Sequence, residues 1–285
     1  PTGLCPNSGK VFSKSAIKSN FTLSTGFKKV GILQDAAVPY VGKIINIDIG
    51  LSKNYLLKQS KKFLSISGRD IKNLRLALPP KNLSKYNRGR TLLITGSNKY
   101  LGAASLVIKG ALASGVGLVK VLVPEIIAKS IWQVAPEVVL EGYLECSSEG
   151  NSLLNESFKK IDFNCFDSIV IGPGIGIDIF DWEKCLSKLM KFEGILILDA
   201  DVLNRIALSK EGCQFFLNKR FRTWITPHIN EFQRLFPNLK ESNNIELAVR
   251  AAKEFDISIL LKGAHSIIAD SNGTAWQIYE TDADS

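Results

Sequence analysis

Glycines, carboxylates and one lysine recur in short segments that each follow an apolar, β-branched run. These segments are Gly96-Ser97 with Gly102-Ala103, Gly172-Pro173-Gly174-Ile175-Gly176, Asp199-Ala200-Asp201, Thr226-Pro227-His228 and Lys262-Gly263. Glycines allow a backbone to approach a ligand closely, carboxylates suit a cation, and a lysine suits a phosphate. Ligands bind beyond the carboxyl ends of parallel strands, so we expect all these segments along one rim of a parallel sheet.

The two glycine-rich segments have a structural alternative. Gly96 to Ala103 joins a strand to a helix of small residues, and free N–H groups at a helix start suit a phosphate or a polar ligand edge. A tight turn with glycines for close packing explains this segment equally well. Gly172 to Gly176 holds three glycines in five positions, and a turn needs such residues too.

Asp199 and Asp201 close the most apolar strand of the chain. Two carboxylates there are costly unless they face polar partners or a cation, and two positions apart on an extended chain they share a face. A helix N-cap by Asp201 would explain one acid and leave Asp199 unexplained. We therefore favour a site with Mg²⁺ or its bound waters.

The remaining two segments pair a basic side chain with a turn. His228, one of two histidines, stands at a strand end beside Glu231, which either caps the following helix or helps to hold Mg²⁺ through water. Lys262 and Gly263 join two strands and suit a nucleotide phosphate, although an ordinary hairpin with an exposed lysine is preferred for this segment in isolation.

From Arg90 onward, strands and helices alternate at the spacing of α/β units. The pattern predicts an α/β fold with a mostly parallel central sheet, helices on both faces and a terminal hairpin split by Asn272-Gly273. The expected strands are 92–95, 118–123, 168–171, 195–198, 223–225 and 259–261, and the hairpin strands are 265–269 and 275–279. The expected helices are 101–114, 182–192 and 245–255.

The order and the residues of these segments resemble those of the NAD(P)H-hydrate dehydratase family, a ribokinase-like group that repairs hydrated NADH and NADPH. The resemblance implies roles for each matching residue. Substrate contacts are implied for Gly102, Ala103, Gly172, Gly174, Gly176 and His228. Contacts with the adenine nucleotide are implied for the stretch Lys262, Gly263, Ala264, His265 and Ser266, in which His265 is expected to be incidental. The Asp-Ala-Asp-x-Leu-Asn pattern of the family corresponds to Asp199 to Asn204, and we expect Asp199, Asp201 and Glu231 to hold Mg²⁺, directly or through water.

The activity implied by the resemblance is ADP- or ATP-dependent dehydration of (6S)-NAD(P)H hydrate. Phosphorylation of the hydrate's hydroxyl and loss of phosphate would restore the dihydropyridine. The catalytic base of the family is the Asp of a Gly-x-Gly-Asp loop after the hairpin, and the sequence to Ser285 does not contain that loop. We therefore expect the base beyond Ser285, and little turnover by this chain alone. A sugar or vitamin kinase of the same ribokinase-like group remains the alternative.

The first 50 residues resemble the tail of an NAD(P)H-hydrate epimerase domain, on the stretches Pro1-Thr2-Gly3-Leu4 and Lys28-Lys29-Val30-Gly31-Ile32. Gly42 to Gly50 alternates apolar residues and predicts a strand. We expect an epimerase-like remnant over 1–50, a basic linker over 51–89 and the dehydratase domain over 90–285, with the chain cut at both ends. In the full-length protein, the resemblance implies epimerase activity, for which K⁺ is a candidate cofactor.

The net charge of +9 raises the question of nucleic-acid binding. Residues 51–90 hold eleven Lys or Arg against one acid, Asp70, so the remainder is close to neutral. This basic stretch lacks aromatic interleaving for base stacking, which favours a solvated connector and ranks a nucleic-acid-binding module third. No apolar run approaches the length of a membrane-spanning helix, and five widely spaced cysteines do not predict a disulfide framework. We expect a cytoplasmic protein that forms a monomer or a homo-oligomer.

Overall fold

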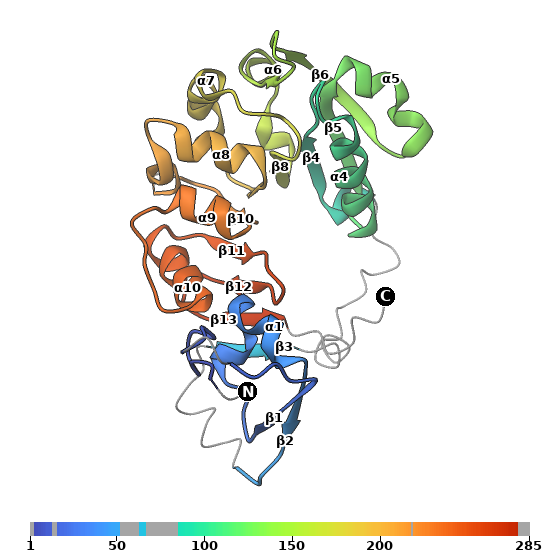
Figure 1. The fold of residues 1–285 in the computed structure, drawn as a ribbon. Coiled ribbons are helices and arrows are strands. Elements are labelled where there is room, and N and C mark those ends of the chain that lie inside the picture. The colour runs from blue at the N-terminus through green and yellow to red at the C-terminus, as the bar shows by residue number, and fades with distance from the viewer. Residues whose placement is uncertain (1–2, 13–15, 52–62, 67–84, 218, 279–285) are drawn as a thin grey trace. The chain divides into compact units, whose positions relative to one another are not determined.

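A computed structural model describes residues 3–12, 16–51, 63–66, 85–217 and 219–278 (Figure 1). The chain divides into two compact units. The first unit combines Pro1–Leu76 with Asn238–Ser285, and the second unit is Ala77–Pro237.

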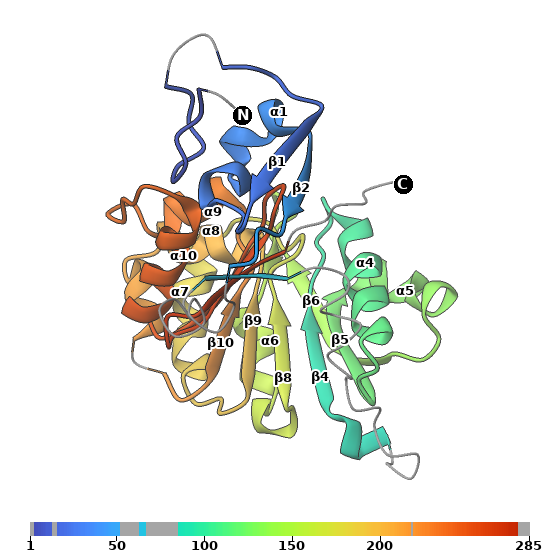
Figure 2. The same ribbon diagram turned by 90° about the horizontal axis from the view of Figure 1, so that it is seen from below.

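The second unit is built on seven neighbouring strands (Figure 2). Their order is β10-β9-β8-β4-β5-β6-β7, and every pair is parallel except β6 with β7. The mostly parallel sheet predicted from the sequence is thus confirmed. The strands are β4 (Arg90–Ile94), β5 (Leu118–Pro124), β6 (Val139–Cys146), β7 (Ser152–Leu153), β8 (Ser168–Ile171), β9 (Ile195–Leu198) and β10 (Arg222–Ile225).

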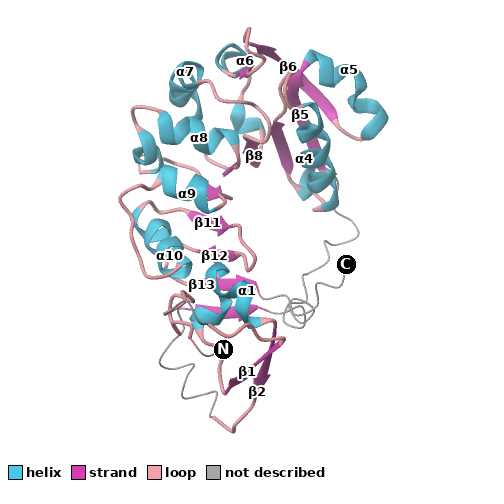
Figure 3. Ribbon diagram, viewed as in Figure 1, coloured by secondary structure: helices cyan, strands magenta, loops and turns pink. Residues whose placement is uncertain are grey.

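Helices alternate with these strands along the chain (Figure 3). They are α4 (Leu101–Ala113), α5 (Glu125–Val134), α6 (Asn155–Lys160), α7 (Ile179–Leu189), α8 (Asp201–Leu208) and α9 (Ile229–Leu235), with 3₁₀ turns η3 (Lys85–Arg88), η4 (Phe163–Cys165) and η5 (Gly212–Phe216). Leu93 packs into one apolar cluster with Ala104 and Ile108 of α4. Because strand side chains alternate, its neighbours Leu92 and Ile94 face the other side, and all three are inaccessible to solvent. Both faces of β4 are therefore covered.

The chain crosses this sheet in two directions. From β4 it moves through α4 and α5 to β5 and β6, and from β8 it moves the opposite way, through α7 and α8, to β9 and β10. Parallel crossovers are right-handed, so a reversal of direction places the two sets of helices on opposite faces. This topology accounts for helices on both faces of the sheet.

Predicted and observed elements agree best where a strand is apolar throughout. The strands at 168–171 and 195–198 have the predicted bounds, and the others differ by one or two residues at their ends. The sequence did not predict α5, β6, β7 or α6. Much of β6 is exposed or half-buried, so its residues lack the apolar pattern that marks a buried strand.

The first unit holds a two-stranded sheet and a group of four further neighbouring strands. β1 (Phe21–Thr25) pairs in parallel with β2 (Lys43–Ile47), which confirms a strand near the predicted position. The four strands have the order β3-β13-β12-β11, from β3 (Phe63–Ile66), β13 (Ala275–Ile278), β12 (Ile267–Ala269) and β11 (Ser258–Leu261). β12 and β13 form the predicted hairpin. Helices α1 (Val38–Val41) and α10 (Asn244–Glu254) and turns η1 (Val30–Leu33) and η2 (Asp35–Ala37) complete the unit.

The N-terminal segment of the first unit is tied to residues more than 200 positions away. Gln277 donates from Nε2 to the carbonyl of Leu33 (2.9 Å), and the Asn244 N–H donates to Oε1 of Gln34 (3.1 Å). Both glutamines are buried, so these bonds replace lost contacts with water. β3 lies inside the segment that the sequence predicts as a linker. Residues 52–62 and 67–84 of that segment lie outside the described residues. The assignment of 1–50 to an epimerase-like domain stays a prediction.

Candidate functional site

The second unit has a topological switch point between β4 and β8. These strands are neighbours, and the chain leaves them in opposite directions across the sheet. Ligands of open α/β sheets bind at such a point, beyond the carboxyl ends of the two strands. The loops that follow β4 and β8 are the two glycine-rich segments predicted to bind substrate.

These two loops are in direct contact. Thr95 donates from its hydroxyl to the carbonyl of Pro173 (2.7 Å), and the Gly96 N–H donates to the same oxygen (2.9 Å). A Cβ added at Gly174 would lie 2.5 Å from the Cβ of Ala103, which is too close for any side chain. The structure therefore brings Gly102-Ala103 and Gly172 to Gly176 to one place at the rim.

The start of α4 is open to a ligand. Its N-cap residue, Tyr100, makes no side-chain capping bond, so a side chain of that residue does not satisfy the first N–H groups of the helix. Open space surrounds the position that a Cβ would take on Gly102. Beneath the loop, the buried hydroxyl of Ser97 has no hydrogen-bond partner among the residues that the structure describes. An anion or a polar ligand edge fits this helix start.

Each glycine of the 172–176 loop is required by contact with a different part of the second unit. Gly172 has φ +132°, and a Cβ there would lie within 1.8 Å of the carbonyl oxygen of Asp199. At Gly176, with φ +74°, a Cβ would lie 2.3 Å from Oδ1 of Asn151. Packing therefore explains this spacing of glycines without a ligand, and substrate contact remains a proposal for these residues.

Asn151 joins three segments of the rim and was missed by the sequence analysis. Its Oδ1 accepts from Nζ of Lys99 (3.2 Å), in the loop after β4, and its Nδ2 donates to the carbonyl of Ile177 (3.0 Å), in the loop after β8. The next residue, Ser152, donates from its hydroxyl to the carbonyl of Gly96 (2.8 Å). An asparagine among Ser, Glu and Gly predicts only a turn, so no sequence signal marked it.

A fully buried arginine donates hydrogen bonds to the backbone of the same loop. Arg205 of α8 donates from Nε to the carbonyl of Gly176 (2.8 Å) and from Nη2 to the carbonyls of Ser152 (2.7 Å) and Ile175 (3.1 Å). Its Nη1 lies 3.5 Å from Oδ2 of Asp181, which is also buried. Burial lowers the pKa of Arg205, and the charge of Asp181 opposes that shift.

The sequence does contain a signal for Arg205. It stands among the apolar residues Val202, Leu203 and Ile206, within a helix whose inner side is buried. A charged side chain on such a face must be paired, and Asp181 is available on the preceding helix. Asp181 also accepts from the N–H groups of Leu154 (2.6 Å) and Asn155 (3.1 Å).

The predicted acidic pair is arranged differently from the expectation. Ala200 has φ +55° and serves as the N-cap of α8, so the chain is not extended between Asp199 and Asp201 and the two carboxylates do not share the face of a strand. Asp201 occupies the first helical position, so the alternative of an N-cap by Asp201 is also wrong. Its Oδ2 accepts from the N–H of Gly176 (2.9 Å), and Oδ1 of Asp199 accepts from the N–H of Ala200 (2.9 Å).

The carboxylates at this rim suit a metal ion that brings other ligands with it. Among the described residues, no group of three or more His, Cys, Asp and Glu side chains could hold a metal by itself. Mg²⁺ retains waters and typically binds one or two protein carboxylates together with substrate phosphates. Asp199 and Asp201 fit such an ion, and their role with magnesium remains a proposal.

His228 and Glu231 form a reciprocal cap at the start of α9. Nδ1 of His228 accepts from the N–H groups of Asn230 (3.1 Å) and Glu231 (3.3 Å), and Oε2 of Glu231 accepts from the N–H of His228 (2.8 Å). An imidazole that accepts at Nδ1 carries its proton on Nε2 when neutral. The capping role expected for Glu231 is present, while the side chain of His228 is 46% exposed and can reach a ligand.

The predicted nucleotide loop lies in the first unit, between β11 and β12. Gly263 and Ala264 are exposed, and the hydroxyl of Ser266 donates to the carbonyl of Gly263 (3.4 Å). The N–H of Ala264 donates to Oδ1 of Asp35 (3.1 Å), from the N-terminal segment. Burial lowers the pKa of His265, and the negative charge of Asp35 partly opposes that shift. Sequence reasoning missed Asp35, because its partner is 229 positions away.

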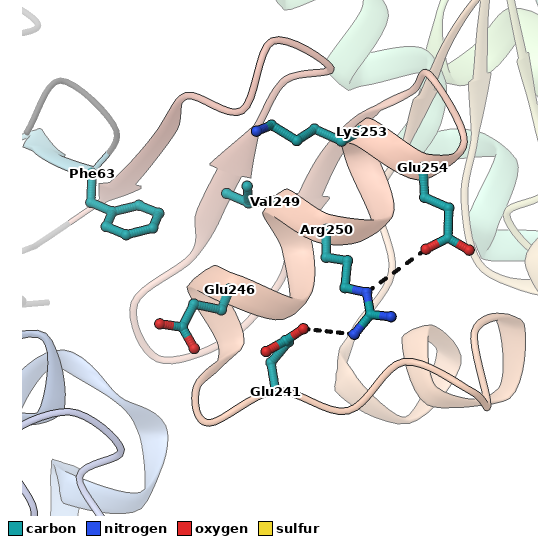
Figure 4. A pocket seen from close by; sticks show the side chains of 7 residues that line it. All are labelled: Phe63, Glu241, Glu246, Val249, Arg250, Lys253 and Glu254. Carbon is teal, nitrogen blue, oxygen red and sulfur yellow. Dashed lines mark hydrogen bonds and ion pairs between the residues drawn. The ribbon is translucent and has the colours of Figure 1, made fainter.

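A separate hollow in the first unit contains none of the predicted site residues (Figure 4). Arg250 lies between Glu241 (2.8 Å) and Glu254 (3.8 Å), which pair with its guanidinium. Phe63 of β3 and Val249 of α10 supply apolar walls. Arg250 is thus paired with Glu254 on α10 and with Glu241 before that helix, and the hollow holds no residue predicted for the site.

Among the described residues, no helix combines the length and apolarity that crossing a membrane requires. The fold itself matches known structures. A ribokinase-like superfamily protein from Enterococcus faecalis aligns with a TM-score of 0.62, at 22% identity, over 76% of this chain and 72% of its own. The ribokinase-like fold class predicted from the sequence is thus confirmed.

A second solved structure with this fold is that of a nucleotide-dependent enzyme. It is the ADP/ATP-dependent NAD(P)H-hydrate dehydratase from Bacillus subtilis, co-crystallised with ATP and Mg²⁺. It aligns with a TM-score of 0.57, at 25% identity, over 70% of this chain and 66% of its own.

The family model of the NAD(P)H-hydrate dehydratases matches residues 91–284, and the chain belongs to this family. The resemblance inferred from the loops is confirmed. The bifunctional NAD(P)H-hydrate repair enzyme Nnr of Gloeobacter violaceus is 32% identical over 97% of this chain and 53% of its own. The ADP-dependent (S)-NAD(P)H-hydrate dehydratase of Nitrosopumilus maritimus is 34% identical over 70% of this chain and 69% of its own. The chain thus spans about half the length of the bifunctional relatives that it matches.

The support that Arg205 gives to the rim can be measured as stability. We expect Arg205→Met to lower the free energy of unfolding by about 3–5 kcal/mol in urea denaturation, because it leaves Asp181 and three carbonyls buried without their partner. Arg220→Met is the matched control, since Arg220 is 76% exposed and its pair with Glu193 is worth at most ~1 kcal/mol. A loss for Arg205→Met no larger than that of the control would show that the network does not hold the loop.

Proposed function

We propose that this chain provides the dehydratase part of an NAD(P)H-hydrate repair enzyme, which converts (6S)-NAD(P)H hydrate to NAD(P)H with ADP or ATP. The observation that carries the proposal is the contact between the two glycine-rich loops at the switch point of the sheet. Membership of the dehydratase family supports it. The hydroxyl of the hydrate would be phosphorylated, and loss of phosphate would then restore the dihydropyridine ring.

The substrate side of this proposal uses residues of the second unit. The N–H of Gly102, at the start of α4, would donate to the polar edge of the hydrated nicotinamide nucleotide. Ala103, whose N–H donates to the carbonyl of Tyr100 (3.4 Å), would contact the same ligand. Gly172, Gly174 and Gly176 would line the pocket with backbone alone. Nε2 of the half-exposed His228 lies 3.4 Å from Oε1 of Glu231 and would turn its hydrogen bond to the same ligand when the ligand is bound.

The nucleotide side uses the loop of the first unit. Lys262 would act as a point charge on a phosphate, and Gly263, Ala264 and Ser266 would supply backbone and hydroxyl contacts, with His265 incidental. Asp199, Asp201 and Glu231 would hold Mg²⁺ directly or through its waters. When bound, this ion would neutralise phosphate charge during transfer.

Three further parts of the proposal extend beyond the residues described. The catalytic base would be an Asp of a Gly-x-Gly-Asp loop beyond Ser285. An epimerase domain, with K⁺ as its candidate cofactor, would precede the chain in the longer protein. The protein would act in the cytoplasm without a nucleic-acid partner, as a monomer or a homo-oligomer. The relatives named as bifunctional repair enzymes, of whose length this chain spans about half, support a second domain in the longer protein.

The dehydratase activity is tested by the return of near-ultraviolet absorbance when NADPH hydrate is incubated with ADP or ATP and Mg²⁺. Two proteins are compared, this chain and a version extended through the native residues that follow Ser285. We expect recovery with the extended version and little with this chain, because the base lies on the added residues. Lys262→Ala should slow recovery, and Lys240→Ala, an exposed lysine outside the site, serves as the control.

The same samples separate the proposal from the kinase alternative. A sugar or vitamin kinase of this fold would leave the hydrate unchanged and would accumulate a stable phosphorylated alcohol when small alcohols are supplied. Absence of absorbance recovery with either nucleotide and either protein, together with such a product, would contradict the dehydratase proposal.

The contact of Asp35 with the nucleotide loop gives a second prediction. Its carboxylate accepts the hydrogen bond of the Ala264 N–H, so this N–H cannot at the same time bind a phosphate. The negative charge of the carboxylate also repels phosphate. We expect Asp35→Asn to tighten binding of ADP by about threefold to tenfold at low salt, measured by isothermal titration calorimetry.

Asp48→Asn is the matched control for Asp35→Asn. Asp48 is also exposed in the N-terminal segment, but its Oδ1 accepts only from the nearby N–H of Gly50 (2.9 Å). ADP binding should be unchanged in this variant. Weaker binding of ADP to Asp35→Asn would show instead that the carboxylate holds the loop in the conformation that binds.

A further inference from the structure

The N-terminal segment places a carboxylate against the loop between β11 and β12. Oδ1 of Asp35 accepts from the N–H of Ala264 (3.1 Å). A Cβ added at Gly263 would lie 2.9 Å from Oδ2 and 3.1 Å from Oδ1 of the same side chain, so both oxygens lie close to the turn. Asp35 stands outside residues 91–284, which the family model matches. One charge at this loop therefore comes from a part of the chain that precedes the matched residues.

The neighbours of Asp35 keep its backbone next to the loop. The carbonyl of Leu33 accepts from Nε2 of Gln277 (2.9 Å), and Oε1 of Gln34 accepts from the N–H of Asn244 (3.1 Å). Leu33 is also buried in the apolar cluster of the N-terminal segment. A ligand of the loop would therefore bind with the carboxylate beside it.

The charge of Asp35 acts across the loop. Burial is the largest influence on the pKa of His265 and lowers it. Among the charges that act on this histidine, Asp35 raises the pKa, and Lys28 lowers it by a smaller amount. The N-terminal segment thus contributes more negative than positive charge at a loop whose expected ligand is a phosphate. Asp35 is exposed, so dissolved salt weakens this effect.

A fixed charge beside a phosphate site can distinguish nucleotides that share the same adenosine. ATP carries one more negative charge than ADP, and ADP carries one more than AMP. A carboxylate beside their phosphates repels the more highly charged nucleotide more strongly. Specificity often rests on such a repulsive group, which weakens binding of one ligand more than binding of another.

We propose that Asp35 is a specificity-determining residue of the nucleotide site, where its negative charge disfavours ATP relative to ADP. This inference rests on the proposed function, in which the loop 262–266 binds the phosphoryl donor. Asp35 takes no part in the chemical step. A carboxylate could instead hold the Mg²⁺ of the nucleotide, but its effect would then depend on Mg²⁺, whereas repulsion acts without the ion.

The test measures equilibrium binding of AMP, ADP and ATP by isothermal titration calorimetry at low salt, in EDTA and with Mg²⁺. Each nucleotide is titrated into the unchanged chain, Asp35→Asn, Asp35→Glu and the control Asp48→Asn. Asparagine keeps an acceptor for the N–H of Ala264 and removes the charge, whereas glutamate keeps the charge. Asp48 is an exposed carboxylate of the same segment that accepts from the N–H of Gly50 (2.9 Å).

We expect Asp35→Asn to raise the affinity for ATP about threefold more than the affinity for ADP, in EDTA and with Mg²⁺. The gain for AMP should be smaller than that for ADP, and the differences should shrink at high salt. Asp35→Glu and the control should leave the ratio of the ADP and ATP affinities unchanged. An equal change for all three nucleotides, in either direction, would overturn the inference. Weaker binding that occurs only with Mg²⁺ would also overturn it and would assign Asp35 to the metal ion.

Failure of the proposed function gives a different result from failure of this inference. If neither this chain nor the version extended beyond Ser285 binds ADP or ATP, the assignment of the loop 262–266 to the nucleotide fails, and the inference fails with it. If both nucleotides bind and Asp35→Asn leaves the ratio of their affinities unchanged, the proposed function stands and only the role of Asp35 is excluded.

Discussion

One buried guanidinium holds the rim on which the rest of the site depends. A charge taken out of water is tolerated only when its donors are satisfied, and Arg205 directs its donors to the carbonyls of Gly176, Ile175 and Ser152 and toward Asp181. The loop after β8 therefore cannot relax without leaving a buried charge unpaired. Its other side is fixed by Asp201, which accepts from the N–H of Gly176. The backbone of the loop is therefore hydrogen-bonded to both Arg205 and Asp201 without a ligand.

This constraint explains why the glycines of the loop are spaced as they are. The backbone at Gly172 lies against that of Asp199, the backbone at Gly174 lies against the loop after β4, and the backbone at Gly176 lies against the side chain of Asn151. Each of the three glycines is therefore required by a separate close contact. These are the three glycine positions of the family's pattern. The same packing sets the backbone at the switch point beside the open start of α4, where the proposed substrate would bind. Packing and ligand binding thus favour the same residues, and the sequence alone could not separate the two causes.

The sequence predicted those features that local patterns determine. Continuous apolar runs bounded by Gly or Asp marked β8 and β9, and Asn272-Gly273 marked the hairpin of β12 and β13. Features that depend on distant partners were missed. Arg205 bonds Ser152, 53 positions away, and Asp35 bonds Ala264, 229 positions away. The positive φ of Ala200 is held by the surrounding fold, so an extended Asp199-Ala200-Asp201 was the natural but wrong expectation.

The most direct test of the account is amide hydrogen exchange of this chain with and without NADH hydrate, because it locates binding without requiring turnover. We expect saturating hydrate to slow exchange in the segments 96–104 and 172–178, where the start of α4 and the glycine loop would receive the ligand. The first turn of α4 should show the larger change, because the N–H of Gly176 is already bonded to Asp201. Unchanged exchange in both segments, with protection elsewhere in the second unit, would contradict the assignment of the substrate site.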